Sequence, residues 1–212
     1  RLAVILSIVT ACSPPDGPVF GTTIDVPIPA TGNETGPRFS QGADGRLVLS
    51  WMESVDSGTA LQYAVLADQA FGQFGRVVVE PRMFVNWADL PSVMQVRDNH
   101  WIAHWLRYSA DRTYSYDVVV SQSVNGGQTW SEAVTAHTDG TPTEHGFVSM
   151  YPQVDGVGLL WYFGEQLMDL VVGSGSPFEE LQIQRIGNRP DLLQGTGRRR
   201  IVGIERDKHL PR

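Results

Sequence analysis

The 212-residue chain is poor in cysteine: Cys12 is the only one, so no disulfide can form within the chain. Basic side chains are also fewer than acidic ones, 16 against 23, and the net charge of −7 disfavours a nucleic-acid partner, whose phosphates carry the same sign. Nucleotide-binding glycine loops, paired-cysteine motifs and Ser-His-Asp signatures are absent, and we expect no cofactor. Helical periodicity is missing as far as residue 163, whereas 22 glycines, 13 prolines and six tryptophans favour a turn-rich all-β fold.

The longest N-terminal apolar run, residues 2–11, is too short to span a bilayer but suits the core of a signal peptide. It ends in Val-Thr-Ala-Cys, which resembles a bacterial lipobox, and the Ser-Pro-Pro-Asp-Gly-Pro that follows reads as a tether. We therefore expect residues 1–12 to be a lipoprotein-type signal segment and residues 13–35 a tether and entry strand. A lipid on Cys12 would hold the protein at a membrane of the bacterial cell envelope. The alternative is a buried N-terminal strand with a chance cysteine.

An internal repeat recurs about every 55 residues. Three segments, Pro37–Trp51, Pro91–Trp105 and Tyr151–Trp161, each read as a strand, a polar turn and a second strand. Their closing tryptophans are separated by 54 and 56 residues, and further strands follow inside the first two units. Four strands in a unit of this length are typical of a β-propeller blade. A β-sandwich is the alternative, but it does not require this recurrence.

The repeat accounts for only part of a propeller. Six blades at this period need about 320 residues, whereas residues 36–163 hold about three four-stranded blades. Past residue 163 the pattern fades, and the net charge changes from −12 in residues 1–184 to +5 in residues 185–212. We expect residues 164–212 to be an atypical tail, for example a shifted reading frame or a fragment end.

One hairpin carries a motif. Residues 123–130 read Ser-Val-Asn-Gly-Gly-Gln-Thr-Trp and match S-x-[D/N]-x-G-x-T-W, the Asp-box. Its glycines tolerate positive φ, its asparagine can bond amides across the turn, its hydroxyls can close the turn and its tryptophan can pack beneath it. The motif is architectural and indicates no catalytic residue. Its specified residues are Ser123, Asn125, Gly127, Thr129 and Trp130.

With this motif, the blade period and the leader, residues 36–163 resemble bacterial sialidase-like (BNR-repeat) proteins, especially small exo-α-sialidase lipoproteins. The resemblance implies a six-bladed propeller that removes terminal sialic acid from glycans with retention of configuration. It also implies an arginine triad, an aspartate acid/base, and a tyrosine nucleophile assisted by a glutamate. The patches that carry it are Asn86–Ser92, Ala103–Leu106, Tyr116–Val118 and Asp139–Phe147.

The resemblance implies roles for five residues of this chain. Arg38 would be the first arginine that grips the substrate carboxylate, although its Pro-Arg order departs from the family's Arg-x-Pro. Asp56 and Asp89 are the two candidates for the acid, which requires a pKa raised by burial. Glu144 would assist the tyrosine or bind a substrate hydroxyl, and His145 would bind substrate. The alternatives are a surface arginine, a solvated turn at Asp56, and a histidine bonded to Glu144 or main chain.

No metal site is predicted, because no third ligand at metal spacing accompanies His137 and His145. The remaining arginines and the tyrosine nucleophile are expected in later blades, so Arg107, Arg112, Tyr114 and Tyr116 receive no role.

The leading interpretation is an incomplete exo-α-sialidase-like glycoside hydrolase acting on sialylated glycans, inactive as this chain alone. The alternatives are a non-catalytic Asp-box propeller that binds glycans or proteins at the cell surface, and a glycosidase of another sugar on the same scaffold.

Overall fold

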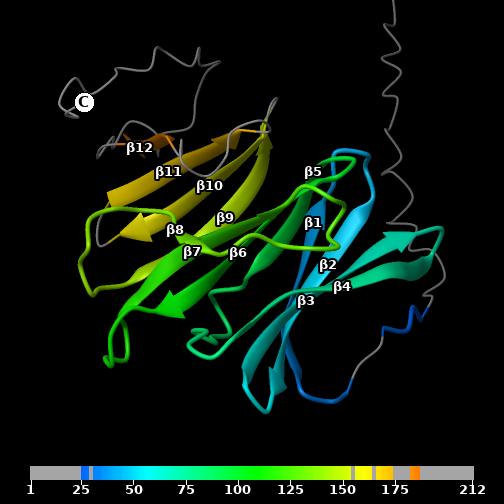
Figure 1. Ribbon diagram of the computed structural model, residues 1–212, viewed down its shortest axis with the longest axis horizontal. Coiled ribbons are helices and arrows are strands. Elements are labelled where there is room, and N and C mark those ends of the chain that lie inside the picture. The colour runs from blue at the N-terminus through cyan, green and yellow to red at the C-terminus, as the bar shows by residue number, and fades with distance from the viewer. Residues whose placement is uncertain (1–24, 29–30, 154–155, 164–165, 174–181, 187–212) are drawn as a thin grey trace, which may run out of the picture.

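The computed structural model describes residues 25–28, 31–153, 156–163, 166–173 and 182–186. Cys12 and the expected signal segment lie outside these residues, as do residues 187–212. Strands and turns make up the described chain, and no helix occurs in it (Figure 1). The structure therefore shows no helix long and apolar enough to cross a membrane among the residues searched.

In the part of the chain that the structure describes, twelve strands form three four-stranded antiparallel sheets, each a meander whose neighbouring strands are consecutive in the chain. The prediction of an all-β fold is confirmed. None of the sheets is closed on itself. The first sheet holds β1 (Glu34–Gln41), β2 (Leu47–Val55), β3 (Gly58–Ala67) and β4 (Ala70–Glu80). The second holds β5 (Ser92–Arg97), β6 (His100–Tyr108), β7 (Tyr116–Ser123) and β8 (Val134–Thr135). The third holds β9 (His145–Gln153), β10 (Gly156–Phe163), β11 (Gln166–Gly173) and β12 (Gln182–Ile186).

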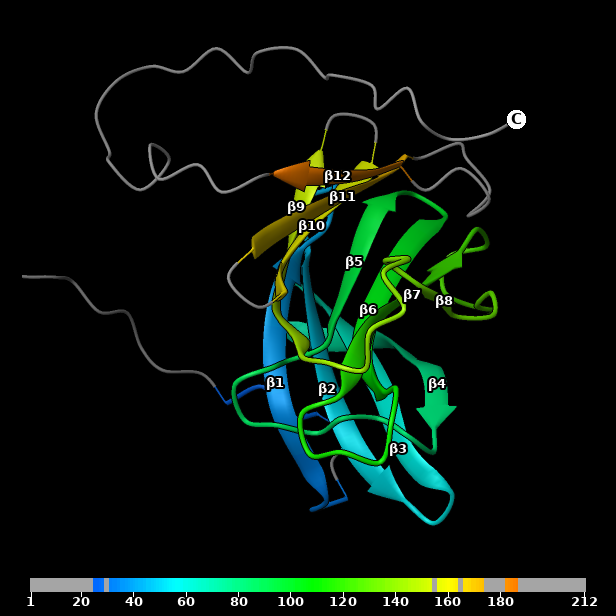
Figure 2. The same cartoon turned by 90° about the vertical axis from the view of Figure 1, so that its left-hand side faces the viewer.

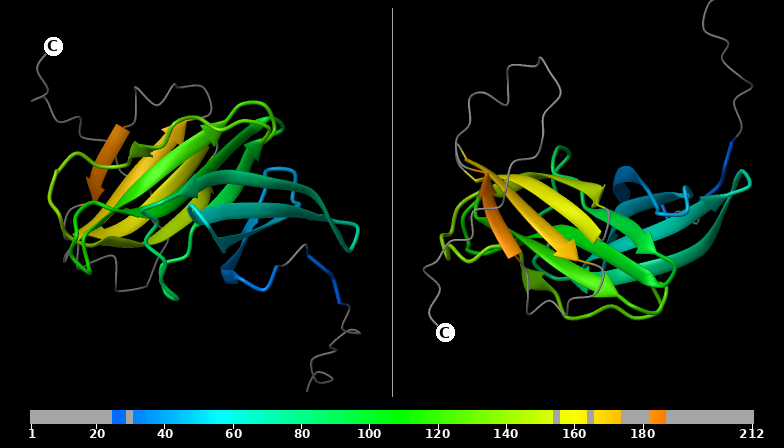
Figure 3. Two further views of the ribbon diagram at one scale, coloured as in Figure 1. Left: turned by 60° about the horizontal axis from the view of Figure 1, so that its bottom comes forward. Right: turned by 90° about the horizontal axis from the view of Figure 1, so that it is seen from above.

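The three sheets lie side by side in chain order, with the second between the other two (Figures 1 and 3). One apolar cluster fills the space between the first and second sheets, and another fills the space between the second and third. The repeating tryptophans Trp51, Trp105 and Trp161 occupy the second strand of each sheet and are all buried. Burying side chains of this size stabilises a fold by roughly 1.5–3 kcal/mol each, so the sequence recurrence marks positions in the core.

The first strands of the sheets, β1, β5 and β9, lie close together (Figure 2), and hydrogen bonds join them. The Oγ of Ser40 on β1 donates to the carbonyl of Val93 on β5. Arg38 Nη1 donates to the carbonyl of Leu90 at 3.3 Å and to that of Val148, on β9, at 3.0 Å. The entrances to β5 and β9 therefore meet beside β1, and residues from the preceding loops are brought to the same place.

The Asp-box hairpin joins β7 to β8. Asn125 Oδ1 accepts a hydrogen bond from the Thr129 amide at 2.9 Å, and Ser123 Oγ accepts one from the Gly127 amide at 2.9 Å. These bonds satisfy main-chain donors that no strand partner reaches. The motif thus folds its own turn by local hydrogen bonds.

Packing also fixes this hairpin onto the first sheet. Trp130 lies edge-on to Tyr63 of β3, with ring centroids 6.1 Å apart. Gly127 has φ of 83°, and a Cβ there would lie 2.0 Å from the Tyr63 hydroxyl oxygen. Only glycine fits, because both the conformation and the space exclude a side chain.

The third sheet extends beyond the predicted end of the blade pattern at residue 163. β11 pairs with β10 from Gln166 to Gly173, and β12 pairs with β11. Strands pair through main-chain groups and need no tryptophan, so the recurring tryptophans do not mark these two strands. The expectation of an atypical tail stays a prediction.

Candidate active site

A tyrosine lies between two carboxylates at the edge of the second sheet. Tyr116 begins β7, Asp89 lies in the loop before β5, and Glu144 precedes β9. The Tyr116 hydroxyl donates to Glu144 Oε1 at 2.7 Å and lies 3.3 Å from Asp89 Oδ2. The three residues, here called the Tyr116 cluster, are 27 and 28 positions apart in the chain and meet only through the fold.

Asp89 is buried, and its Oδ1 accepts a hydrogen bond from the Phe147 amide. Burial raises the pKa of Asp89 above its ordinary value, and the nearby charge of Glu144 adds to the increase, against the lowering effect of the bonds from Phe147 and Tyr116. Because Oδ1 is an acceptor, a proton on Asp89 belongs on Oδ2, the atom that faces Tyr116.

Tyr116 is fully buried and stacks on Phe84 with ring centroids 3.9 Å apart. Burial raises its pKa, and so do the hydrogen bond to Glu144 and the charges of Glu144 and Asp89. The phenol is therefore neutral and donates its single proton to Glu144. If Asp89 carries a proton, it can donate that proton to the free lone pair of Tyr116, and a continuous proton path would then run from Asp89 through Tyr116 to Glu144.

Arg38 approaches the cluster from β1. Its Nη1 binds the carbonyls of Leu90, next to Asp89, and Val148, next to Phe147. Within the described chain, its Nε and Nη2 form no hydrogen bond, so the N–H groups of these two nitrogens stay available to a ligand. Burial and the charge of Arg38 lower the pKa of the neighbouring His104 to about 3, so this histidine is neutral.

The start of β9 is shaped to fit the cluster. A Cβ on Gly146 would lie 2.9 Å from the Tyr116 hydroxyl oxygen and 3.0 Å from Asp89 Oδ1. Phe147 has φ of 56°, a left-handed conformation that is rare and costly for a residue other than glycine. Backbone strain therefore coincides with the cluster, as is common at functional sites.

The other residues expected at the site are not part of the cluster. Asp56 lies exposed in the turn between β2 and β3 and bonds none of these groups. His145 is fully buried, and its Nδ1 lies 3.1 Å from the carbonyl of Tyr116 and not against Glu144. Tyr116 itself received no role from the sequence, because the resemblance placed the tyrosine nucleophile in later blades.

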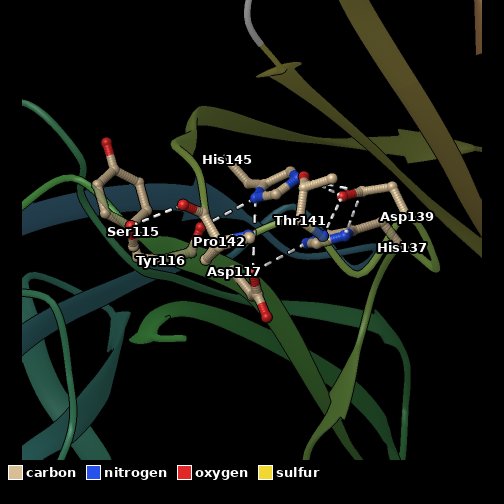
Figure 4. A network of polar contacts seen from close by, with 8 residues as sticks. All are labelled: Ser115, Tyr116, Asp117, His137, Asp139, Thr141, Pro142 and His145. Atoms are coloured by element: carbon tan, nitrogen blue, oxygen red, sulfur yellow. Dashed lines mark hydrogen bonds and ion pairs between the residues drawn. The ribbon is translucent and has the colours of Figure 1, made fainter. Parts of the chain in front are cut away.

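A second polar cluster adjoins the first (Figure 4). The imidazoles of His137 and His145 stack 3.7 Å apart, with Asp117 at one edge and Asp139 at the other. Burial and the neighbouring His145 lower the pKa of His137, against the raising effect of the two aspartates. Asp117, on β7, offers a third potential metal ligand beside the two histidines. The spacing of residues along the sequence did not reveal it.

Comparisons with known proteins give little further guidance. No family model matches the chain, and no curated protein matches it. Among solved structures, it is similar to a "putative glycoside hydrolase" from Parabacteroides distasonis, with a TM-score of 0.43 and 11% identity over 73% of this chain and 53% of that one. The chain thus spans about half the length of that protein.

Proposed function

We propose that this chain is part of a sialidase-like β-propeller glycoside hydrolase, whose full-length parent removes terminal sialic acid from glycans. The observation that carries the proposal is the Tyr116 cluster: a neutral tyrosine hydrogen-bonded at 2.7 Å to a glutamate and placed 3.3 Å from an aspartate of raised pKa. A tyrosine nucleophile with a carboxylate base suits an anionic sugar, because a carboxylate nucleophile would be repelled by the substrate.

In this mechanism Glu144 accepts the phenolic proton while the Tyr116 oxygen attacks the anomeric carbon. Asp89 protonates the departing glycosidic oxygen, so the glycosidic bond breaks as the tyrosyl bond forms. Water then attacks the same carbon and gives a proton to Asp89, while the bond from that carbon to the Tyr116 oxygen breaks and this oxygen takes its proton back from Glu144. Tyr116 is fully buried in this structure, so the strained segment at Phe147 has to move for substrate to enter.

Surrounding groups support a sugar acid as substrate. Arg38 offers two unused guanidinium donors to a carboxylate within the described chain. Trp87, two residues before Asp89, is 89% exposed, and Tyr114, two residues before Tyr116, is 61% exposed. Exposed aromatic rings beside an acid pair can stack on the apolar face of a sugar.

The alternative function is a non-catalytic propeller that binds glycans or proteins at the cell surface. The complete burial of Tyr116 favours this alternative, because a nucleophile must reach its substrate. We also propose, from the sequence alone, that the lipid on Cys12 places the protein at the bacterial envelope.

A fluorogenic sialoside assay on the full-length protein, at pH values from about 4 to 8, distinguishes the two functions. We expect release of the fluorophore and a loss of at least about 100-fold in kcat/KM for Tyr116→Phe. Tyr162→Phe, which removes an exposed hydroxyl on β10, is the matched control and should retain activity. Absence of release at every pH, with retained binding of the sialoglycan in calorimetry, would support the binding protein instead.

A further inference from the structure

The His137–His145 pair offers three metal-ligand atoms on one edge of the stacked rings. His137 Nε2 lies 3.6 Å and His145 Nδ1 3.4 Å from the same atom, Asp117 Oδ1, and the three groups offer ligand atoms that all lie within 4.8 Å of one another. Ligands of a tetrahedral zinc ion with bonds of about 2.0–2.1 Å are separated by about 3.3 Å. The spacing of the three atoms therefore approaches that of a bound metal.

The opposite edge has the partner that metal-binding histidines require. His137 Nδ1 and His145 Nε2 lie 2.7 and 3.1 Å from one atom, Asp139 Oδ2. Histidine ligands almost always direct their second ring nitrogen to a carboxylate or carbonyl, which fixes the tautomer. One aspartate thus serves as ligand, and the other orients both rings.

The buried histidine pair and its two aspartates leave polar atoms unpaired and negative charge unbalanced, and a cation would satisfy both. The His137 side chain is 4% exposed, yet its Nε2 forms no hydrogen bond, and Asp117 Oδ1 lies 3.6 Å from this nitrogen. No arginine or lysine of the described residues pairs with either aspartate. The cluster brings two aspartates to the histidine pair, and a divalent cation would balance their carboxylates.

We propose that Asp117, His137 and His145 bind a zinc ion, with Asp139 as their hydrogen-bond partner. Binding requires the two rings to tilt out of their parallel stack, because the lone pair of each nitrogen lies in its ring plane. His145 must also move its proton from Nδ1, which lies 3.1 Å from the Tyr116 carbonyl, to Nε2, which faces Asp139. That carbonyl or a water is available as the fourth ligand.

The ion would connect the second sheet to the third beside the Tyr116 cluster. Asp117 follows Tyr116 on β7, His145 follows Glu144 at the start of β9, and His137 begins the loop between them. A single ion would hold this loop at both ends and so fix Glu144 against Tyr116. The metal site itself does not depend on the proposed hydrolase activity.

Zinc titration of the chain tests the site. The protein is freed of metal with a chelator and titrated with Zn²⁺ in competition with a chromogenic indicator, with Co²⁺ as a second probe. We expect one Zn²⁺ per chain, with a Kd below about 1 μM, and a Co²⁺ absorption spectrum of four-coordinate type. His137→Asn and Asp117→Asn should each weaken binding at least tenfold, and Asp139→Asn about 10–100-fold.

Two histidines outside the site provide matched controls. His100→Asn removes a buried histidine of β6, and His209→Asn removes the histidine that lies outside the described residues. Both should bind zinc as the wild type does. The proposal would be overturned by absence of stoichiometric binding, or by a loss in His209→Asn equal to that in His137→Asn. Circular dichroism checks that each variant is folded. If His137→Asn does not fold, Asp117→Asn tests the site in its place.

Discussion

Replacement of Asp89 by asparagine tests whether this buried carboxyl is protonated in the folded protein. Asparagine has the shape of the protonated acid: its oxygen can accept from the Phe147 amide, and its NH₂ can donate to the Tyr116 oxygen. Tyr116 would keep its bond to Glu144, which is 2.7 Å long. The Asn variant therefore preserves every hydrogen bond of the Tyr116 cluster and removes only the need to bury a charge.

The expected magnitude follows from the pKa of Asp89, which burial raises. A group with a raised folded pKa contributes its full stability below the unfolded value, about 3.9, and loses it as the pH rises through the folded value. Each unit of increase is worth about 1.4 kcal/mol at higher pH. Asp89→Asn should therefore match the wild type near pH 4 and equal or exceed its free energy of unfolding at pH 7.

Asp89→Ala gives the opposite result. It removes the acceptor of the Phe147 amide, a part-buried hydrogen bond, which costs about 1–3 kcal/mol at every pH. Urea unfolding followed by tryptophan fluorescence between pH 4 and 8 measures all three proteins, with Asp56→Asn, in the exposed turn, as the unaffected control. If Asp89→Asn destabilises the protein at pH 7 as much as Asp89→Ala does, Asp89 is ionised there and the proton path is wrong.

Two glycines give further tests by urea unfolding. Gly146→Ala places a Cβ 2.9 Å from the hydroxyl of the site tyrosine and should cost about 1–3 kcal/mol, whereas Gly72→Ala, with nothing within 4 Å, should cost little. Gly127→Ala combines positive φ with a Cβ 2.0 Å from the Tyr63 hydroxyl and should cost about 2–5 kcal/mol. Gly140 also has a positive φ, but a Cβ there would meet nothing within 4 Å. Gly140→Ala therefore isolates the conformational part of the destabilisation, about 1–2 kcal/mol. Equal losses at Gly127 and Gly140 would show that the packing against Tyr63 is unimportant.

Local sequence determined the parts of this protein that need only local chemistry. Turn residues and the recurring tryptophans predicted an all-β chain of four-stranded units, because strand alternation and turn preferences act over a few residues. The Asp-box hydrogen bonds also lie within one hairpin. Asp89 and Glu144 were selected as site candidates through the family resemblance.

The packing of the sheets decided the rest. Tyr116 appears in sequence as one more strand tyrosine, and only the meeting of β5, β7 and β9 places its hydroxyl between Asp89 and Glu144. Asp117 likewise joins His137 and His145 from another segment of the chain. Which polar atoms of distant strands meet depends on how the sheets stack around their shared apolar clusters, and no spacing along one chain segment encodes that geometry.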